Sequence, residues 1–220
     1  MTGYADFLLL IVAALSVSIV ATSRLTSCVR ASALQGLALS LLPLALWGPA
    51  LDRHALPVAL MSLGTLAVKA IIIPLLLSRA IREANVRREA EPFISLHVSV
   101  LIAAALVGFS FWLGTILVLP RPAPTALLVP IAFATVLVGF LVLVSRRKAV
   151  TQVVGYLMLE NGIFIFGQIL VEEVPFAVEL GILLDLLVGV FVMGIAINHI
   201  SREFEHIDTE RLSTLKDWGP

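Results

Sequence analysis

The stretch GYLMLENGIFIFG, from Gly155 to Gly167, decides the fold class, because it is mostly apolar. A carboxylate, Glu160, and a carboxamide, Asn161, interrupt this apolar run. A membrane span needs about 20 mostly apolar residues to cross about 30 Å of hydrocarbon, and this stretch is the centre of such a run. The whole chain has the same character: 60% of its 220 residues are hydrophobic and its mean hydropathy is +1.05, whereas soluble domains are about 45–50% apolar. We therefore expect an all-α integral membrane protein with one polytopic domain.

Charge, cysteine content and motifs exclude several classes of partner and site. The formal net charge is zero, so nothing indicates a nucleic-acid partner. The single cysteine, Cys28, excludes an internal disulfide and a cysteine-rich zinc or iron–sulfur site. The sequence contains no His-Glu-x-x-His zinc motif, phosphate-binding Gly-x-x-x-x-Gly-Lys loop or dinucleotide fingerprint. No signal peptide is expected, because the first apolar run begins near Tyr4 without a preceding Lys or Arg and contains Asp6.

Seven segments are apolar enough to be predicted as membrane spans. The second is the weakest of them, because it is short and holds Gln35 and Pro43. The connections between the segments are short and polar, as connections between helices are expected to be. The predicted spans are 4–22, 31–47, 56–77, 94–119, 125–144, 152–171 and 176–199.

The basic residues give these spans one orientation, because cytoplasmic connections are enriched in Lys and Arg. Twelve of the fifteen basic residues fall in the first, third and fifth connections and in the C-terminal tail. Arg53 and Arg121 fall in the even connections, and Lys69 lies inside a span. We therefore expect the N-terminus outside and the C-terminus in the cytoplasm. The twelve are Arg24, Arg30, Arg79, Arg82, Arg87, Arg88, Arg146, Arg147, Lys148, Arg202, Arg211 and Lys216.

The chain is expected to contain a seven-helix transmembrane domain, residues 1–200, and a cytoplasmic tail, residues 201–220. The tail mixes charges of both signs with Phe204, Ile207, Leu212 and Leu215. This pattern suits docking on a neighbouring subunit, and a solvated, half-ordered tail is the alternative.

Three ionisable residues fall deep within the predicted spans. With a rise of about 1.5 Å per residue, Glu160 lies roughly 12 Å and Lys69 roughly 10 Å from the cytoplasmic surface, and Asp185 about 13 Å from the outer surface. All three would then share one layer near the middle of the bilayer. Each mid-span charge costs about 2.5–3.5 kcal/mol on the insertion scale. Leucine would pack better there, so these residues indicate a function, and proton relays use such side chains.

Two shallower groups flank this layer. His97 lies in the first turns of the fourth span, on the cytoplasmic side, and Glu179 in the first turns of the seventh, on the outer side. We predict that Glu160, Asp185 and Lys69 form the centre of a proton relay, with His97 contributing on the cytoplasmic side and Glu179 more weakly on the outer side.

The third span carries a polar stripe that leads to its lysine. Ser62, Thr65 and Lys69 fall on one face of a helix. Pro74 removes a backbone donor and is expected to kink the helix just past Lys69.

Small and amide residues accompany the predicted acids. Gly181 and Gly189 flank Asp185 at intervals of four residues, which lets another helix approach closely. Asn161 and Gln168 are expected to be hydrogen-bond partners between helices, not proton carriers.

Structural roles are the alternative for each predicted relay residue. Lys69 would then form a structural ion pair with Glu160 or with an acid of another subunit, and Asp185 would serve packing alone. His97 would be a solvated residue at the interface. Glu179 would be a wetted acid at a helix N-terminus, where negative charge is favoured.

The stretches RRKAVTQVVGYLMLENG (146–162) and LLDLLVGVFVMGIAINH (183–199) resemble the small three-helix subunit K of respiratory complex I. In that family a basic connection leads into a helix with a glycine, a buried glutamate and an asparagine, and the next helix carries a second buried acid followed by glycine. Arg146 and Arg147 supply the basic connection here. The other positions that match the family's frame are Gly155, Asn161, Asp185 and Gly189.

The first acid departs from the family's frame. Leu157 stands where the family has glutamate, and Glu160 lies three residues later, about one turn along nearly the same helix face. The resemblance covers about residues 125–200, and four further helices precede it. That arrangement resembles component E of hydrogenase-4, a membrane complex related to complex I and built around a nickel–iron hydrogenase.

The resemblance implies a membrane subunit without a redox cofactor of its own, in the cytoplasmic (inner) membrane of a prokaryote. Nickel–iron and iron–sulfur centres would be carried by partner subunits. The partners would be antiporter-like membrane subunits, a membrane subunit that resembles the quinone-site subunit, and peripheral hydrogenase subunits. The buried acids would form part of a hydrophilic axis that moves protons or sodium ions when electrons are transferred elsewhere in the complex.

Two other functions stay open. A stand-alone ion-coupled secondary transporter would need a substrate cavity and usually an internal repeat, and neither is clear in the sequence. A structural anchor that holds larger subunits together would tolerate neutral residues at the acidic positions.

Overall fold

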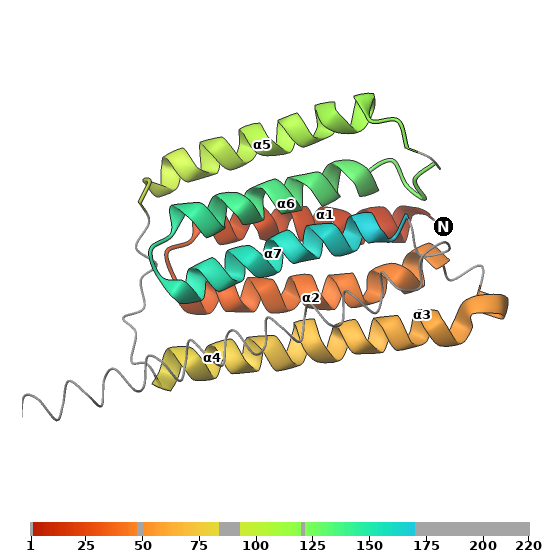
Figure 1. Cartoon of the computed structure of the whole chain (residues 1–220), viewed down its shortest axis with the longest axis horizontal. Coiled ribbons are helices and arrows are strands. Elements are labelled where there is room, and N and C mark those ends of the chain that lie inside the picture. Colours follow the sequence, from red (N-terminus) through yellow and green to blue (C-terminus); the bar gives the residue numbers. More distant parts are fainter. Residues whose placement is uncertain (1, 48–50, 84–92, 120–121, 170–220) are drawn as a thin grey trace, which may run out of the picture.

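A computed structural model describes residues 2–47, 51–83, 93–119 and 122–169. These residues form long helices that lie side by side and are joined by short connections (Figure 1). In chain order they are α1 (Thr2–Ala21), α2 (Leu25–Trp47), α3 (Leu51–Thr65), the π-helical segment η2 (Leu66–Ile72), α4 (Ile73–Glu83), α5 (Leu96–Ile116), α6 (Leu128–Ser145) and α7 (Ala149–Gly167).

Six stretches of this described part are long and apolar enough to cross a membrane, and α3, η2 and α4 together supply one of them, Val58–Arg79. The chain is therefore an all-helical, multi-pass membrane protein over these residues. The six stretches correspond to the first six predicted spans. The predicted seventh span, 176–199, and the tail, 201–220, lie outside the described residues, so the count of seven and the orientation stay predictions.

The predicted start of the second span is wrong. Helix α2 begins at Leu25 rather than at residue 31, so Arg30 lies within the helix and not in a connection. The Arg30 side chain is exposed, and a long arginine stem can lie along an apolar helix while its charge reaches the interface. Gln35, which made this span look weak, is fully buried and hydrogen-bonded to α1.

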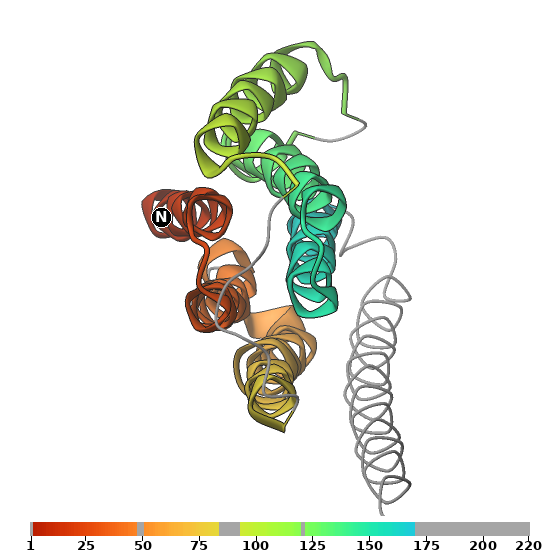
Figure 2. The same cartoon turned by 90° about the vertical axis from the view of Figure 1, so that its left-hand side faces the viewer.

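Viewed along the helices, α1 and α2 lie beside α6 and α7, with α5 at one edge and the α3–η2–α4 rod at the other (Figure 2). The tightest pairing is between α6 and α7. Two short connections, 22–24 and 146–148, hold α1 against α2 and α6 against α7 as antiparallel neighbours.

Buried apolar side chains form two clusters along the bundle. One gathers near the end where α1 joins α2 and includes Ile19, Val142 and Val154. The other gathers toward the opposite end and includes Leu9 and Ile165. Between them lies a layer of buried polar side chains contributed by α1, α2, η2 and α7, and this layer is the candidate site.

Candidate functional site

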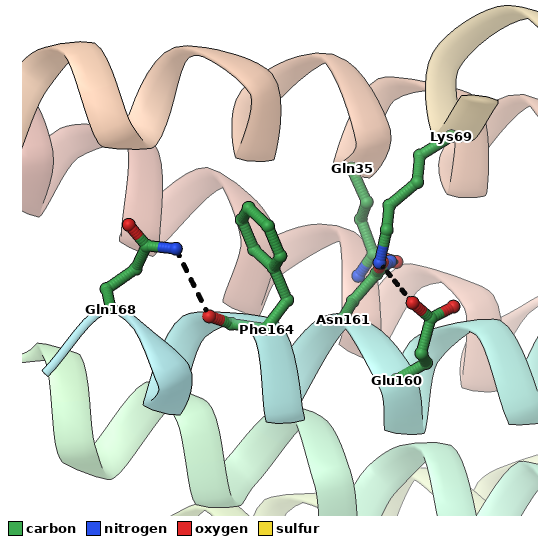
Figure 3. Close-up of polar contacts among 6 residues, drawn as sticks. All are labelled: Gln35, Lys69, Glu160, Asn161, Phe164 and Gln168. Atoms are coloured by element: carbon green, nitrogen blue, oxygen red, sulfur yellow. Dashed lines mark hydrogen bonds and ion pairs between the residues drawn. The ribbon is translucent and has the colours of Figure 1, made fainter. Parts of the chain in front are cut away.

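An ion pair lies in the middle of the bundle. Lys69 Nζ lies 2.7 Å from Glu160 Oε1, and each side chain is 4% exposed. The lysine comes from η2 and the glutamate from α7, and Figure 3 shows them facing each other. The fold therefore brings together two of the predicted relay residues, which are 91 positions apart in the sequence.

The backbone around Lys69 departs from α-helical winding. Lys69 lies within η2, and Pro74 follows that segment at the second position of α4. Proline gives no N–H to the preceding turn, and π-helical turns occur often at functional sites. The π-helical winding therefore includes Lys69 itself, and the kink expected past Lys69 stays a prediction. On the other side, a Cβ at Gly36 of α2 would lie 2.6 Å from the carbonyl carbon and oxygen of Lys69, so only glycine lets α2 approach this closely.

Close contact with α6 fixes the rotation of α7. A Cβ at Gly139 would lie 2.5 Å from Leu159 N, and one at Gly155 would lie 2.6 Å from Leu143 N. The two backbones thus touch through facing glycines, as small residues permit in membrane helices. Because this face of α7 is taken by α6, Glu160 is presented to the side where α2 and η2 lie.

Amide side chains extend the pair toward α1. Lys69 Nζ donates to Asn161 Oδ1 at 3.1 Å, and Asn161 Nδ2 donates to Gln35 Oε1 at 3.4 Å. Gln35 Nε2 donates to the Val12 carbonyl at 3.2 Å and to Ser16 Oγ at 2.9 Å. These contacts join four segments, η2, α7, α2 and α1, in one layer.

An aromatic ring and the second carboxylate oxygen complete the described surroundings of the pair. The Lys69 ammonium lies 5.1 Å from the centre of the Phe164 ring, within the range of a cation–π contact. Glu160 Oε2 is buried and has no hydrogen-bond partner within the described part of the chain. One carboxylate oxygen is thus held by the lysine, while the other is buried without a donor among the described residues.

Packing alone does not account for this pair. Removing an ammonium and a carboxylate from water costs several kcal/mol per ion, and apolar replacements of buried pairs are often neutral or stabilising. The 2.7 Å contact between Nζ and Oε1 is a hydrogen bond that the lysine donates to the carboxylate.

The polar stripe predicted on the third span is confirmed. Ser62, Thr65 and Lys69 are 6%, 6% and 5% exposed, respectively. The prediction for Asn161 is confirmed as well, because it bonds to residues of two other segments. The prediction for Gln168 is wrong: its amide donates to the carbonyl of Phe164, one turn back in its own segment, at 3.4 Å.

The other predicted relay residues are not part of this cluster in the described chain. His97 is exposed in the first turn of α5, a helix that packs on α6 and α1. Asp185 and Glu179 lie outside the described residues. Their relay roles stay predictions.

Sequence reasoning did not assign Gln35, Ser16 or Phe164 to the site. An amide inside a predicted span was a usable signal for Gln35, because such a group needs a buried partner. Ser16 gave no signal, since a serine can bond to its own helix, and it does donate to the Val12 carbonyl at 2.9 Å.

Within the described ranges, no three His, Cys, Asp or Glu side chains are grouped as a metal site would require.

The register difference from the subunit K frame has a structural consequence. Leu157 is 4% exposed and belongs to the apolar cluster near the α1–α2 connection. Glu160, about one turn further along α7, is at the level of Lys69 and Asn161. The acid of this chain is therefore placed where a lysine from η2 reaches it.

Comparison with known proteins identifies relatives along most of the chain. It is 38% identical over 203 residues to "Uncharacterized protein Rv0085" of Mycobacterium tuberculosis, which covers 92% of this chain and 91% of the relative. It is 26% identical over 155 residues to "Hydrogenase-4 component E" of Escherichia coli K12 and to the protein of the same name in Shigella flexneri. Each of these alignments covers 70% of this chain and 72% of the relative. No family model and no solved structure matches the chain. The chain is therefore a homologue of the mycobacterial protein and a distant homologue of hydrogenase-4 component E.

Proposed function

We propose that this chain is a non-redox membrane subunit of a hydrogenase complex related to complex I, and that the Lys69–Glu160 pair forms the centre of a proton relay in it. Two observations support membership of such a complex: the homology to hydrogenase-4 component E and the six apolar helices. The buried ion pair supports the relay.

The observation that carries the proposal is the combination of one paired and one unpaired carboxylate oxygen on Glu160. Oε1 contacts the Lys69 ammonium, and Oε2 is buried with no hydrogen-bond partner in the described residues. A proton that arrives at Oε2 weakens the ion pair, because it removes the charge of the carboxylate. A proton that leaves strengthens it again. The occupancy of this site is thereby coupled to the electrostatics of η2.

The rest of the relay follows from the predicted spans. Asp185 on the seventh span would exchange protons with this centre at similar depth. His97 would contribute at the cytoplasmic side and Glu179 at the outer side. Moving one charge against 100 mV requires about 2.3 kcal/mol, which electron transfer in partner subunits would supply.

The proposed partners and location follow the same family. The chain would lie in the prokaryotic cytoplasmic membrane beside antiporter-like subunits and a subunit resembling the quinone-site subunit. Peripheral hydrogenase subunits would carry the nickel–iron and iron–sulfur centres. This chain would contribute side chains to ion translocation and no redox group.

The test is the number of protons moved per hydrogenase turnover by the whole complex in inverted membrane vesicles. Glu160→Gln and Asp185→Asn should lower this ratio while the complex still assembles. Glu160→Gln also leaves Lys69 without its carboxylate, and breaking a buried pair on one side costs about 3–5 kcal/mol. A double variant, Lys69→Met with Glu160→Gln, removes both charges and is the matched control for that loss of stability.

The double variant separates the relay from a purely structural pair. A structural pair replaced by neutral side chains of similar size should restore both assembly and proton translocation. The relay predicts restored assembly with a low proton ratio. A double variant that assembles and translocates protons at the wild-type ratio refutes the proposal and favours the structural anchor.

A further inference from the structure

We propose that Gln35 and Asn161 are positioning residues that hold Lys69 as a hydrogen-bond donor toward Asn161 and thereby direct its exchangeable proton to Glu160. This inference rests on the proposed relay and assigns a task to the amide chain beside it. All four side chains are buried, and Gln35 is fully so.

The donor-to-acceptor direction of these hydrogen bonds is set where Gln35 meets α1. The carbonyl oxygen of Val12 can only accept hydrogen bonds. Ser16 Oγ uses its hydrogen toward this carbonyl at 2.9 Å, so it too is an acceptor on its other side. Gln35 Nε2 lies 3.2 Å from the carbonyl and 2.9 Å from Ser16 Oγ. The two orientations of a glutamine amide are ordinarily hard to tell apart, but two acceptors on one side require the NH₂ group there.

The orientation of Gln35 in turn fixes the orientation of the Asn161 amide. Because the NH₂ group of Gln35 faces α1, its Oε1 faces Asn161 and accepts from Nδ2 at 3.4 Å. Asn161 must then turn its Oδ1 to Lys69, whose Nζ lies 3.1 Å away. An amide oxygen only accepts, so Lys69 always donates in this direction.

The consequence for the lysine is directional. Both the ammonium and the neutral amine of Lys69 have hydrogens to donate to Asn161, but the lone pair of the neutral amine cannot point there. Glu160 Oε1 lies 2.7 Å from Nζ. A proton can therefore move between Nζ and Oε1 while the Asn161 contact stays as it is, and the side of Lys69 that faces Asn161 is closed to proton release.

The amide chain is thus a support and not a branch of the proton path. It crosses from η2 and α7 through α2 to α1, and it ends on a main-chain carbonyl that cannot take up a proton at neutral pH. Figure 3 shows Gln35 and Asn161 meeting beside the lysine, with Glu160 next to them. These hydrogen bonds hold the four segments at one level.

The test measures hydrogenase turnover and protons moved per turnover separately, in the whole complex. Gln35→Leu removes the anchor, so Asn161 can turn its NH₂ group toward Lys69 whenever the lysine is neutral, and the proton ratio should fall below the wild-type value. Turnover should be retained. Ser40→Ala is the matched control: this buried serine of α2 donates to the Leu37 carbonyl of its own helix at 2.7 Å and is not one of the site residues, so the ratio should stay at the wild-type value.

A second variant tests whether Gln35 acts through Asn161. Asn161→Leu should lower the ratio. Adding Gln35→Leu to it should lower the ratio no further, because the effects of substitutions within one hydrogen-bond network are not additive. Gln35→Met keeps the side-chain length and serves the same test in case Gln35→Leu does not assemble.

The outcomes distinguish this inference from the proposed function. A wild-type proton ratio in assembled Gln35→Leu or Gln35→Met, together with a low ratio in the Lys69→Met/Glu160→Gln variant, overturns the positioning role alone. Additive effects of Gln35→Leu and Asn161→Leu overturn it as well. A wild-type ratio in the Lys69→Met/Glu160→Gln variant overturns the relay, and the positioning role with it.

Discussion

Substituting Gly36 tests whether the close approach of α2 to η2 holds the ion pair. In Gly36→Ala the new Cβ would lie 2.6 Å from the carbonyl oxygen of Lys69 and 2.9 Å from Ala70 N. Because ordinary contact begins at 3.4 Å, the two backbones must separate by about 0.8 Å. Both neighbours are main-chain atoms, so no side-chain rotation relieves the clash.

The energetic effect has two opposing parts. Overpacking of this kind costs about 1–3 kcal/mol, whereas replacing glycine by alanine inside a helix contributes about 0.5–1 kcal/mol of stability. Gly64→Ala of α3 is the matched control, because no atom lies within 4 Å of its new Cβ. The difference between the two variants therefore isolates the clash, and we expect Gly36→Ala to be less stable than Gly64→Ala by about 1–3 kcal/mol.

The assay is reversible unfolding in mixed micelles, followed by the proton ratio of the assembled complex. The 0.8 Å separation acts directly at Lys69, whose contact with Glu160 is 2.7 Å long, and on Gln35, the neighbour of Gly36. We therefore expect a lower proton ratio in Gly36→Ala and an unchanged ratio in Gly64→Ala. Equal stability of the two variants would refute the packing argument.

Three further predictions concern the helix contacts and the topology. Gly139→Ala should destabilise the protein by about 1–3 kcal/mol, because its Cβ would lie 2.5 Å from a backbone nitrogen of α7. Gly167→Ala is the control and should not destabilise it, because no atom lies within 4 Å of the new Cβ. Unfolding in micelles compares the two variants. Arg146→Ala should lower the free energy of unfolding by about 2–4 kcal/mol, because this 2%-exposed side chain donates to a carbonyl of α1 at 2.7 Å. Thermal unfolding should show a much smaller loss of stability for Arg147→Ala, whose side chain is exposed. In a background without the native cysteine, a membrane-impermeant maleimide should label Ala126→Cys in intact cells and Arg147→Cys only after permeabilisation; the opposite pattern would reverse the predicted orientation.

The membrane class and the first six helices were readable from the sequence, because each span must satisfy its backbone hydrogen bonds internally and present apolar side chains to lipid. These are local requirements, and they leave a local pattern. The same reasoning singled out Lys69 and Glu160, since a mid-span charge stands out against an apolar run. It misplaced the start of α2 because Arg30 has the charge of a connection residue, although its long stem allows it to lie on a helix.

Only the tertiary structure decided which of these charges meet. The contact between Lys69 and Glu160 depends on the rotation of two helices about their axes, and that rotation is set by neighbours that approach through glycine: α6 against α7, and Gly36 of α2 against η2. The direction of the hydrogen bonds from Asn161 through Gln35 to α1 likewise depends on partners from different helices. Hydrophobic periodicity carries no record of these contacts, because they are made between backbones and amides of segments far apart in the chain.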